Sequence, residues 1–299
     1  MEQGGRRESG NVEDRRLSGG GGGGGGWFGG GGGGRGVGGA GLGLVAIVVV
    51  GWFFGVDLSP LLNGQLDVGG GQTSYGGKTE LTAADQAAAK FVSQTLAETE
   101  DIWAALFKEQ VGQPYHPAVL VLYSGVTDSP CGTASGQTGP FYCPGDKKVY
   151  LDTDFFATMA RELGARGDFA QAYVVAHEIG HHVQDELGIL GEANSLRAKV
   201  SDAQSNEISV RIELQADCLA GIWGKEVGDR FGVIEPGDFE EAVNAARQIG
   251  DDTLQQEAGR VPRPESFTHG TSAQRMYWFK RGLESGRLDD CDTFSVKRL

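Results

Sequence analysis

The sequence predicts an α+β domain that is mainly helical, contains a short β-sheet and follows a single transmembrane helix. Three observations predict it: helical periodicity dominates residues 78–299, two short apolar runs of strand type interrupt the helices, and residues 37–56 hold no charge. No repeat at a fixed period is evident. We therefore expect one folded domain over residues 78–299.

The beginning of the chain is dominated by glycine. The protein has 51 glycines in 299 residues, and nearly every position from Ser18 to Ala40 is glycine. Such a segment buries too little apolar surface to fold, so residues 1–36 are predicted to form a disordered tail. A phosphate-binding glycine loop is the alternative, but it needs a preceding strand and a following helix with lysine, and the sequence shows neither.

Residues 37–56 (VGGAGLGLVAIVVVGWFFGV) form the transmembrane candidate. Twenty helical residues at 1.5 Å each span the hydrocarbon core of about 30 Å. The arginines of the tail precede this segment, and Lys78 is the first basic residue after it. The positive-inside rule then predicts a cytoplasmic N-terminus and an extracytoplasmic domain. The arginines on which this orientation depends are Arg6, Arg7, Arg15, Arg16 and Arg35. The alternative interpretation of residues 37–56 is a helix buried in the core of a folded domain.

Residues 57–77 are rich in turn formers and predict a linker. Beyond it, Cys131 and Cys143 bracket a loop rich in Gly, Ser and Pro, which indicates a disulfide in an oxidising compartment. Cys218 and Cys291 could form a second disulfide, or Cys218 could be a buried thiol. No Cys-x-x-Cys spacing supports a zinc site built from cysteine.

Charge excludes one class of partner. The formal net charge is −14, and the first 36 residues hold five arginines against four acidic residues, so the acidic excess lies in the domain. Binding of nucleic acid needs a basic face. The sequence therefore predicts no nucleic-acid partner.

The expected elements follow in order along the domain. Thr82 can cap a first helix over residues 83–110, and Thr153 or Asp154 can cap the next. Strands are expected at 118–123 and 148–151. Further helices are expected at 154–163, 169–187, 196–200, 205–227, 236–249 and 272–283.

The strongest functional signal is His177-Glu178-Ile179-Gly180-His181 in the helix 169–187. On a helix, His177 and His181 lie one turn apart on one face, so both imidazoles can bind one metal ion. Glu178 lies beside that face and can take a proton from a metal-bound water without being a ligand. His182 is rotated off the face and is expected to pack or to support a ligand.

Glu213 is the best candidate for the third ligand of a zinc centre. On its helix, the small residues Ala216, Ala220 and Gly224 share a stripe that allows close approach to the motif helix. Asp217 lies one turn on, where its carboxylate can accept a hydrogen bond from a liganding histidine. The alternative is that Glu213 and Asp217 form a solvated acidic face.

The motif, together with Glu213-Leu214-Gln215-Ala216-Asp217, resembles a gluzincin, a metallopeptidase whose third zinc ligand is a Glu in Glu-x-x-x-Asp. More narrowly, the chain resembles the bacterial neutral zinc metallopeptidase family, including its Arg-rich start (GRRESGNVEDRR), Gly-rich stretch and single span. The resemblance implies a zincin-like domain with a short sheet packed on the motif helix. It also implies Zn²⁺ as cofactor and a peptide or protein substrate.

The expected reaction is hydrolysis of peptide bonds by a membrane-anchored enzyme. His177, His181 and Glu213 would hold zinc, and Glu178 would act as general base on a water of lowered pKa. By resemblance, His269 would stabilise the carbonyl oxygen, with Arg275 in support and Tyr277 as a weaker option; an ordinary loop histidine is the alternative. The strand at 148–151 is the expected edge for an extended substrate. A zinc-binding but non-catalytic extracytoplasmic binding or scaffold protein is the rival hypothesis.

Overall fold

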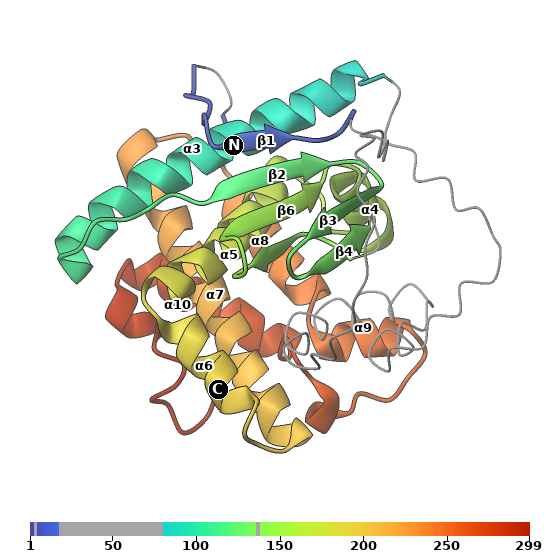
Figure 1. Cartoon of the computed structure of the whole chain (residues 1–299), viewed down its shortest axis with the longest axis vertical. Helices are drawn as coiled ribbons and strands as arrows, with labels where there is room; N and C mark the ends of the chain where they lie inside the picture. The colour runs from blue at the N-terminus through green and yellow to red at the C-terminus, as the bar shows by residue number, and fades with distance from the viewer. Residues whose placement is uncertain (3–4, 18–79, 136–137) are drawn as a thin grey trace, which may run out of the picture.

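The structure is a computed structural model that describes residues 1–2, 5–17, 80–135 and 138–299 (Figure 1). The strands are β1 (Val12–Asp14), β2 (Val119–Tyr123), β3 (Val126–Ser129), β4 (Gly132–Ser135), β5 (Phe141–Cys143) and β6 (Lys148–Asp152). The helices are α3 (Ala83–Leu106), α4 (Phe155–Glu162), α5 (Asp168–Glu186), α6 (Ile189–Arg197), α7 (Asp202–Phe231), α8 (Asp238–Gln248), α9 (Asp251–Glu257) and α10 (Ser272–Ser285). Short helical turns lie at Phe107–Val111, Pro264–Ser266 and Leu288–Cys291. The described chain is therefore mainly helical with a small sheet, as predicted.

The main sheet has the strand order β1-β2-β6-β5. β1, β2 and β6 run parallel, whereas β5 pairs with β6 in the antiparallel sense. β6 is thus a central strand with neighbours on both sides. The expectation that residues 148–151 form a free edge for substrate is wrong, because β2 and β5 occupy both edges of that strand.

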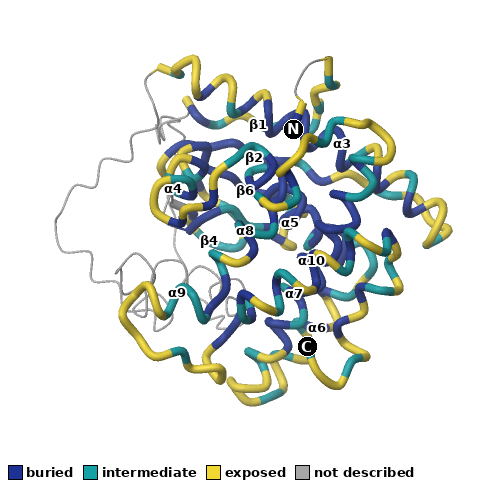
Figure 2. Tube along the Cα trace, turned by 180° about the vertical axis from the view of Figure 1, so that it is seen from behind, coloured by how far each residue is buried: buried dark blue, intermediate teal, exposed yellow. Residues whose placement is uncertain are grey.

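Side chains alternate between the two faces of the sheet, and each face packs on a different layer. Leu120, Leu122 and Leu151 join the large hydrophobic core made with the helices. Val121 and Tyr150 join a smaller core on the opposite face, under the β3–β4 hairpin. The result is three layers, hairpin, sheet and helices, with α5 in the buried interior (Figures 1 and 2).

The helices predicted at 83–110, 154–163, 169–187, 205–227, 236–249 and 272–283 are confirmed with shifted ends. The helix predicted at 196–200 is wrong, because the chain enters α6 at Ile189, directly after the left-handed Gly188, and leaves it at Arg197. The first of the confirmed helices keeps its cap, because Thr82 accepts a hydrogen bond from the Asp85 N–H in a capping box, but it ends at Leu106 and continues as a π-helical turn to Val111. Asp154 precedes α4 as expected without forming a side-chain cap. No sequence pattern predicts α9, which has only seven residues, or the short strands β1, β3, β4 and β5.

The two disulfides are present. Cys131 bonds to Cys143 and so ties the β3–β4 hairpin to β5, while Cys218 of α7 bonds to Cys291 near the C-terminus. The alternative of a free buried thiol at Cys218 is therefore wrong, because its sulfur is covalently paired.

The first part of the predicted disordered tail is ordered. Residues 5–17 lie against the domain and supply β1, which pairs with β2. The physical reason is composition: these residues are not glycine-rich, and their arginines pair with carboxylates, including Glu98 on α3. The prediction that residues 1–36 form a disordered tail is thus wrong for residues 5–17.

The predicted span 37–56 and linker 57–77 lie outside the described residues. Within the described part of the chain, no helix is both long and apolar enough to cross a bilayer.

Candidate metal centre

The site lies where α5 and α7 cross closely. A Cβ placed on Gly180, inside the motif, would lie 3.0 Å from the backbone oxygen of Ala216 and 3.2 Å from its Cα. Ala216, a residue of the small-residue stripe predicted on α7, therefore lies at the contact between the two helices. This close contact places Glu213, one turn earlier on α7, over the histidine face of α5.

The three predicted ligands converge. Nε2 of His177 lies 3.2 Å from Oε2 of Glu213, and Nε2 of His181 lies 3.5 Å from Oε1 of the same carboxylate. One ligand atom from each residue lies within 4.8 Å of the other two. All three side chains are largely buried, with 8, 12 and 16% of their surface exposed for His177, His181 and Glu213.

This arrangement fits zinc. Two ligands about 2.0–2.1 Å from a tetrahedral Zn²⁺ lie about 3.4 Å from each other, close to the separations of 3.2 and 3.5 Å seen here. Two imidazoles and one carboxylate are also a common donor set for catalytic zinc, which keeps a fourth position for water. The residues present therefore fit the metal that the motif predicts.

Asp217 holds His177 in the orientation that a ligand needs. Its Oδ1 lies 3.0 Å from Nδ1 of His177, so Nε2 is left facing Glu213. Asp217 is itself fully buried and accepts hydrogen bonds from Tyr173 and from two nitrogens of Arg275. Burial alone would raise the pKa of Asp217, but Arg275 and His177 outweigh it and hold the pKa below its usual value. The role predicted for Asp217 thus agrees with its geometry.

His181 is oriented by a residue that the sequence reasoning missed. Its Nδ1 lies 2.9 Å from Oε1 of Gln184, one turn on along α5. Gln184 is fully buried, and its amide nitrogen donates to the carbonyl of Ile212 and to Oε1 of Gln215 on α7. The available signal was the three-residue spacing from His181 to an amide side chain on the ligand face.

Glu178 is buried beside the three ligands, and its Oε2 has no hydrogen-bond partner. A buried carboxylate oxygen without a partner is costly, so its presence needs an explanation. Burial raises the pKa of Glu178, although His177 and His181 oppose the rise.

The ligand side chains influence the pKa values of one another. Burial alone would lower the pKa of His177, but hydrogen bonds with Asp217 and Glu213 outweigh it and raise the pKa to about 10. Burial would raise the pKa of Glu213, but the nearby His181, His269 and His177 outweigh it and hold the pKa well below its usual value. Glu213 is therefore a charged carboxylate, the form that binds a metal.

His269 lies near this centre on the loop before α10. Its charge interacts with that of Glu213, and together with Asp251 this raises the pKa of His269, against the lowering that burial causes. Oδ1 of Asp251 lies 3.3 Å from its Nδ1, and Oδ2 accepts the backbone N–H groups of Thr268, His269 and Gly270. Asp251 is a second residue that sequence reasoning missed, because it opens the short α9.

Three other residues, two histidines and a tyrosine, lie apart from the ligand cluster. His182 donates from Nε2 to the carbonyl of His116 and packs against Tyr142, and burial lowers its pKa, as expected for a packing residue. The His116 side chain is 74% exposed and pairs with Glu186. Tyr277 is 54% exposed and lies against Trp278, so it supplies no group to the centre.

Arg275 connects the two halves of the site. Besides binding Asp217, it donates from Nη1 to the carbonyl of Ile249, two residues before Asp251. One buried guanidinium therefore links the group that orients His177 to the turn that holds the His269 loop.

A second acidic cluster, formed by Asp168, Asp238 and Glu241, lies at the start of α5. The α-ammonium group of Met1 lies 3.0 Å from carboxylate oxygens of both Asp168 and Asp238. Asp168 and Asp238 thus already have a cationic partner in this structure.

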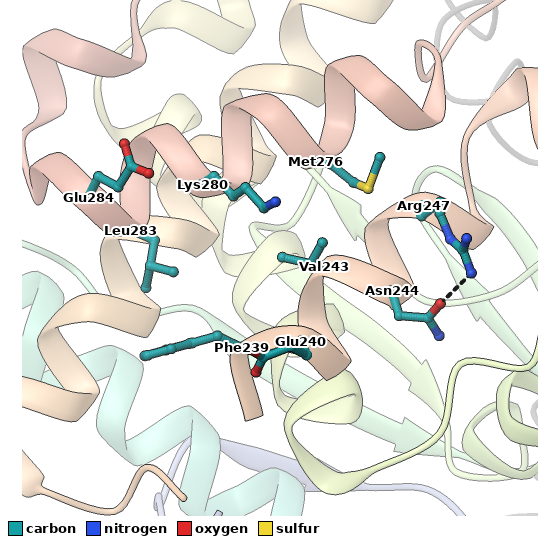
Figure 3. Close-up of a pocket in the computed structure, with 9 residues that line it drawn as sticks. All are labelled: Phe239, Glu240, Val243, Asn244, Arg247, Met276, Lys280, Leu283 and Glu284. Carbon is teal, nitrogen blue, oxygen red and sulfur yellow. Dashed lines mark hydrogen bonds between the residues drawn. The ribbon is translucent and has the colours of Figure 1, made fainter. Parts of the chain in front are cut away.

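A groove of about 560 Å³ lies between α8 and α10 (Figure 3). It is lined by Phe239, Glu240, Val243, Asn244, Arg247, Met276, Lys280, Leu283 and Glu284. No metal ligand lines it, and its polar groups include the hydrogen-bonded pair Arg247 and Asn244. The groove is therefore separate from the candidate centre.

The chain is similar over much of its length to bacterial proteins. "Uncharacterized protein YpfJ" of Escherichia coli (strain K12) is 49% identical over 291 residues, which make up 97% of each chain. "Uncharacterized protein Rv2575" of Mycobacterium tuberculosis (strain ATCC 25618 / H37Rv) is 44% identical over 188 residues, 60% of this chain and 62% of that protein. No solved structure matches the chain.

A family model described as "Putative neutral zinc metallopeptidase" matches residues 1–294, nearly the whole chain and including the ligand helices α5 and α7. The name of the family implies zinc as the cofactor. The chain therefore belongs to the putative neutral zinc metallopeptidase family.

Proposed function

We propose that this protein is a zinc-dependent endopeptidase in which Glu178 is the general base. One observation carries the proposal: Glu178 has a buried, unpartnered carboxylate oxygen beside three ligand side chains that converge at the spacing of a zinc site. A metal site that only stabilises the fold has no use for such a group. A catalytic site does, because the carboxylate has a proton to take from water.

Zinc bound by His177, His181 and Glu213 would polarise the substrate carbonyl and lower the pKa of a bound water toward about 7. With zinc in place, Glu178 would accept a proton from the attacking water and would then return that proton to the leaving amine. Burial raises the pKa of Glu178, which suits a group that takes and gives a proton near neutral pH.

His269 is the proposed donor to the carbonyl oxygen as that oxygen gains negative charge. Nδ1 of His269 faces the Thr268 hydroxyl at 3.0 Å and Oδ1 of Asp251 at 3.3 Å, which leaves Nε2 to act as the donor. The position of His269 near Glu213 supports this role, since the electrostatic effect of each on the other requires closeness.

Among the strands of the sheet, β5 is the best candidate to bind an extended substrate along its edge. β5 is the antiparallel end strand of the sheet, and among the described residues no strand pairs with its outer edge. It contacts α5, and Tyr142 in β5 donates a hydrogen bond to Asp185 of that helix. A sheet with one antiparallel edge strand over a His-Glu-x-x-His helix also supports a zincin-like arrangement. An extended peptide can add to such an edge through main-chain hydrogen bonds.

We further propose that the catalytic domain acts outside the cytoplasm. The two disulfides support this placement, because such bonds persist in oxidising compartments. Attachment to a membrane through residues 37–56 stays a prediction from the sequence, since that segment lies outside the described residues.

The rival function is a zinc-binding protein without turnover, and replacement of Glu178 distinguishes the two. Glu178→Gln keeps the shape of the side chain but removes its basicity, so we expect zinc content to stay at about one ion per chain while peptide hydrolysis is lost. Glu192→Gln, an exposed site on α6, is the matched control and should keep full activity. Hydrolysis that survives Glu178→Gln would reject the mechanism.

A further inference from the structure

Residues 5–17, here called the N-terminal arm, are built into the folded domain. β1 of the arm pairs with β2 in the register Val12↔Leu120 to Asp14↔Leu122. The backbone N–H of Ser9 also donates to the carbonyl of Ser93 on α3, at 3.1 Å. The arm thus joins both the sheet and the helix that lie at this end of the molecule (Figure 1).

Polar side chains bind the arm to α3. Arg6 makes two hydrogen bonds to the carboxylate of Glu98, and the two side chains are only 5 and 7% exposed. Glu100 accepts hydrogen bonds from Ser9 and Asn11 of the arm. An ion pair and two hydrogen bonds from neutral side chains thus connect the arm to carboxylates of α3.

Arg16 fixes the other end of the arm. Its residue surface is 2% exposed, its Nε donates to Asp14, and its Nη1 donates to the backbone oxygen of Asp85 at 2.6 Å. A guanidinium buried to this extent needs its acceptors in place, since an unpaired buried charge is costly. The arm is therefore a structural part of the domain.

The arm and its binding face are separated in the sequence by residues 18–79, which include the apolar segment 37–56. A single crossing within that stretch would place about 30 Å of hydrocarbon between the arm and the domain. Such a separation is incompatible with β1 pairing to β2 and with Arg6 pairing to Glu98.

The same arginines also carry the prediction of a cytoplasmic N-terminus. In the structure Arg6 pairs with Glu98, Arg7 with Glu100 and Asp101, and Arg16 with Asp14. Their charge is thus used within the fold. These three arginines also lie more than 20 residues before residue 37, beyond the distance of about 15–20 residues over which basic residues determine membrane orientation.

We propose that the N-terminal arm and residues 80–299 form one folded unit on the same side of any membrane that the protein meets. The single-pass orientation, with the N-terminus and the domain on opposite sides, is then excluded. This inference goes beyond the proposed peptidase function and does not depend on it.

The test compares the accessibility of the arm with that of the domain in the full-length protein. Leu17→Cys reports on the arm, where Leu17 is 57% exposed, and Val261→Cys reports on the domain, where Val261 is 82% exposed. Leu196→Cys, at a site 48% exposed, is a second domain reporter that must behave as Val261→Cys does. The four native cysteines are paired in disulfides, so under non-reducing conditions a maleimide reads the introduced thiol.

Each single-cysteine protein is treated with a membrane-impermeant maleimide in spheroplasts and again after permeabilisation. Equal labelling of Leu17→Cys and Val261→Cys before permeabilisation is the expected result. Equal protection of both would also support the shared side, while it would contradict the extracytoplasmic placement proposed above. Labelling of one position but not the other before permeabilisation would overturn the inference.

Discussion

Nδ1 of His177 lies 3.0 Å from Oδ1 of Asp217, and this contact turns Nε2 of the histidine toward Glu213. The same pattern recurs at His181, whose Nδ1 faces Gln184 while its Nε2 faces Glu213. Fixing one ring nitrogen of each histidine sets both its tautomer and its orientation. The α5–α7 crossing thus presents three candidate metal ligands whose side chains already converge.

Glu213→Ala should reduce the affinity for zinc by more than about 100-fold, since loss of even an outer partner of a ligand costs about 10–100-fold. Competition with a chelator of known affinity measures the change. Glu207→Ala removes a carboxylate from the same helix, but one that is 61% exposed and pairs with Arg211, so it should leave the affinity unchanged. If both variants bind zinc as the wild type does, the third ligand lies elsewhere.

His269→Ala should lower kcat by about 100-fold or more, the usual loss when one donor to the developing oxyanion is removed. Zinc content should not change, because His269 is not among the three convergent ligands. The measurement is steady-state hydrolysis of a peptide with metal analysis of the same sample. His116→Ala is the control, because that side chain is 74% exposed. A kcat of His269→Ala equal to that of the wild type would show that His269 is an ordinary loop residue.

Asp251 should contribute to stability in a pH-dependent way. Burial alone would raise its pKa, but the bonds from His269 and the backbone outweigh it and hold the pKa below its usual value. A depressed pKa means that the folded state favours the charged carboxylate, so this stability is present above the unfolded pKa and is lost as pH falls through the folded pKa. The stability advantage of wild type over Asp251→Asn should therefore begin to shrink near about pH 5 and continue to shrink as pH falls toward about pH 2. Denaturant unfolding of the metal-free proteins measures it, and a constant difference across that range would contradict the assignment.

Gly282 should be intolerant of a side chain. A Cβ there would lie 1.9 Å from the backbone oxygen of Cys218, so α10 and α7 would have to separate. We expect Gly282→Ala to lower the free energy of unfolding by about 1–3 kcal/mol or more. Gly191→Ala is the matched control, because a Cβ placed at this position of helix α6 would have no atom within 4 Å. That variant should be neutral or more stable by about 0.5–1 kcal/mol, and equal effects in the two would show that the helices do not approach as described.

Arg6→Ala should destabilise the protein by about 3–5 kcal/mol, because it leaves the buried carboxylate of Glu98 without its partner. Burial already raises the pKa of Glu98 despite Arg6. Arg7→Ala removes a guanidinium that is 49% exposed and should cost only about 0–1 kcal/mol. Thermal or denaturant unfolding compares the two, and equal costs would show that the arm is not docked as the structure has it.

The sequence predicts the centre of the site well because local spacing determines it. His177 and His181 share a helix face by periodicity alone, and the small residues beside Glu213 indicate a close helix crossing. Gln184 and Asp251 were missed because their partners are set by packing between elements. Asp251, for example, meets a loop 18 residues further along the chain.

The N-terminal arm was missed for a related reason. β1 has three residues and lacks the apolar alternation of a half-buried strand. The arm is held by an ion pair and by hydrogen bonds to acidic residues of α3 that lie more than 80 positions away. Composition separates glycine-rich from other segments, but it cannot show which distant carboxylates a given arginine meets.

Removal and return of the metal test the central proposal most directly. The purified full-length protein should contain about one zinc ion per chain and cleave a denatured protein substrate. Chelation should abolish cleavage, and about one equivalent of zinc should restore it in the wild type but not in Glu178→Gln. Cleavage that persists in the metal-free wild type, or that returns equally in Glu178→Gln, would contradict it.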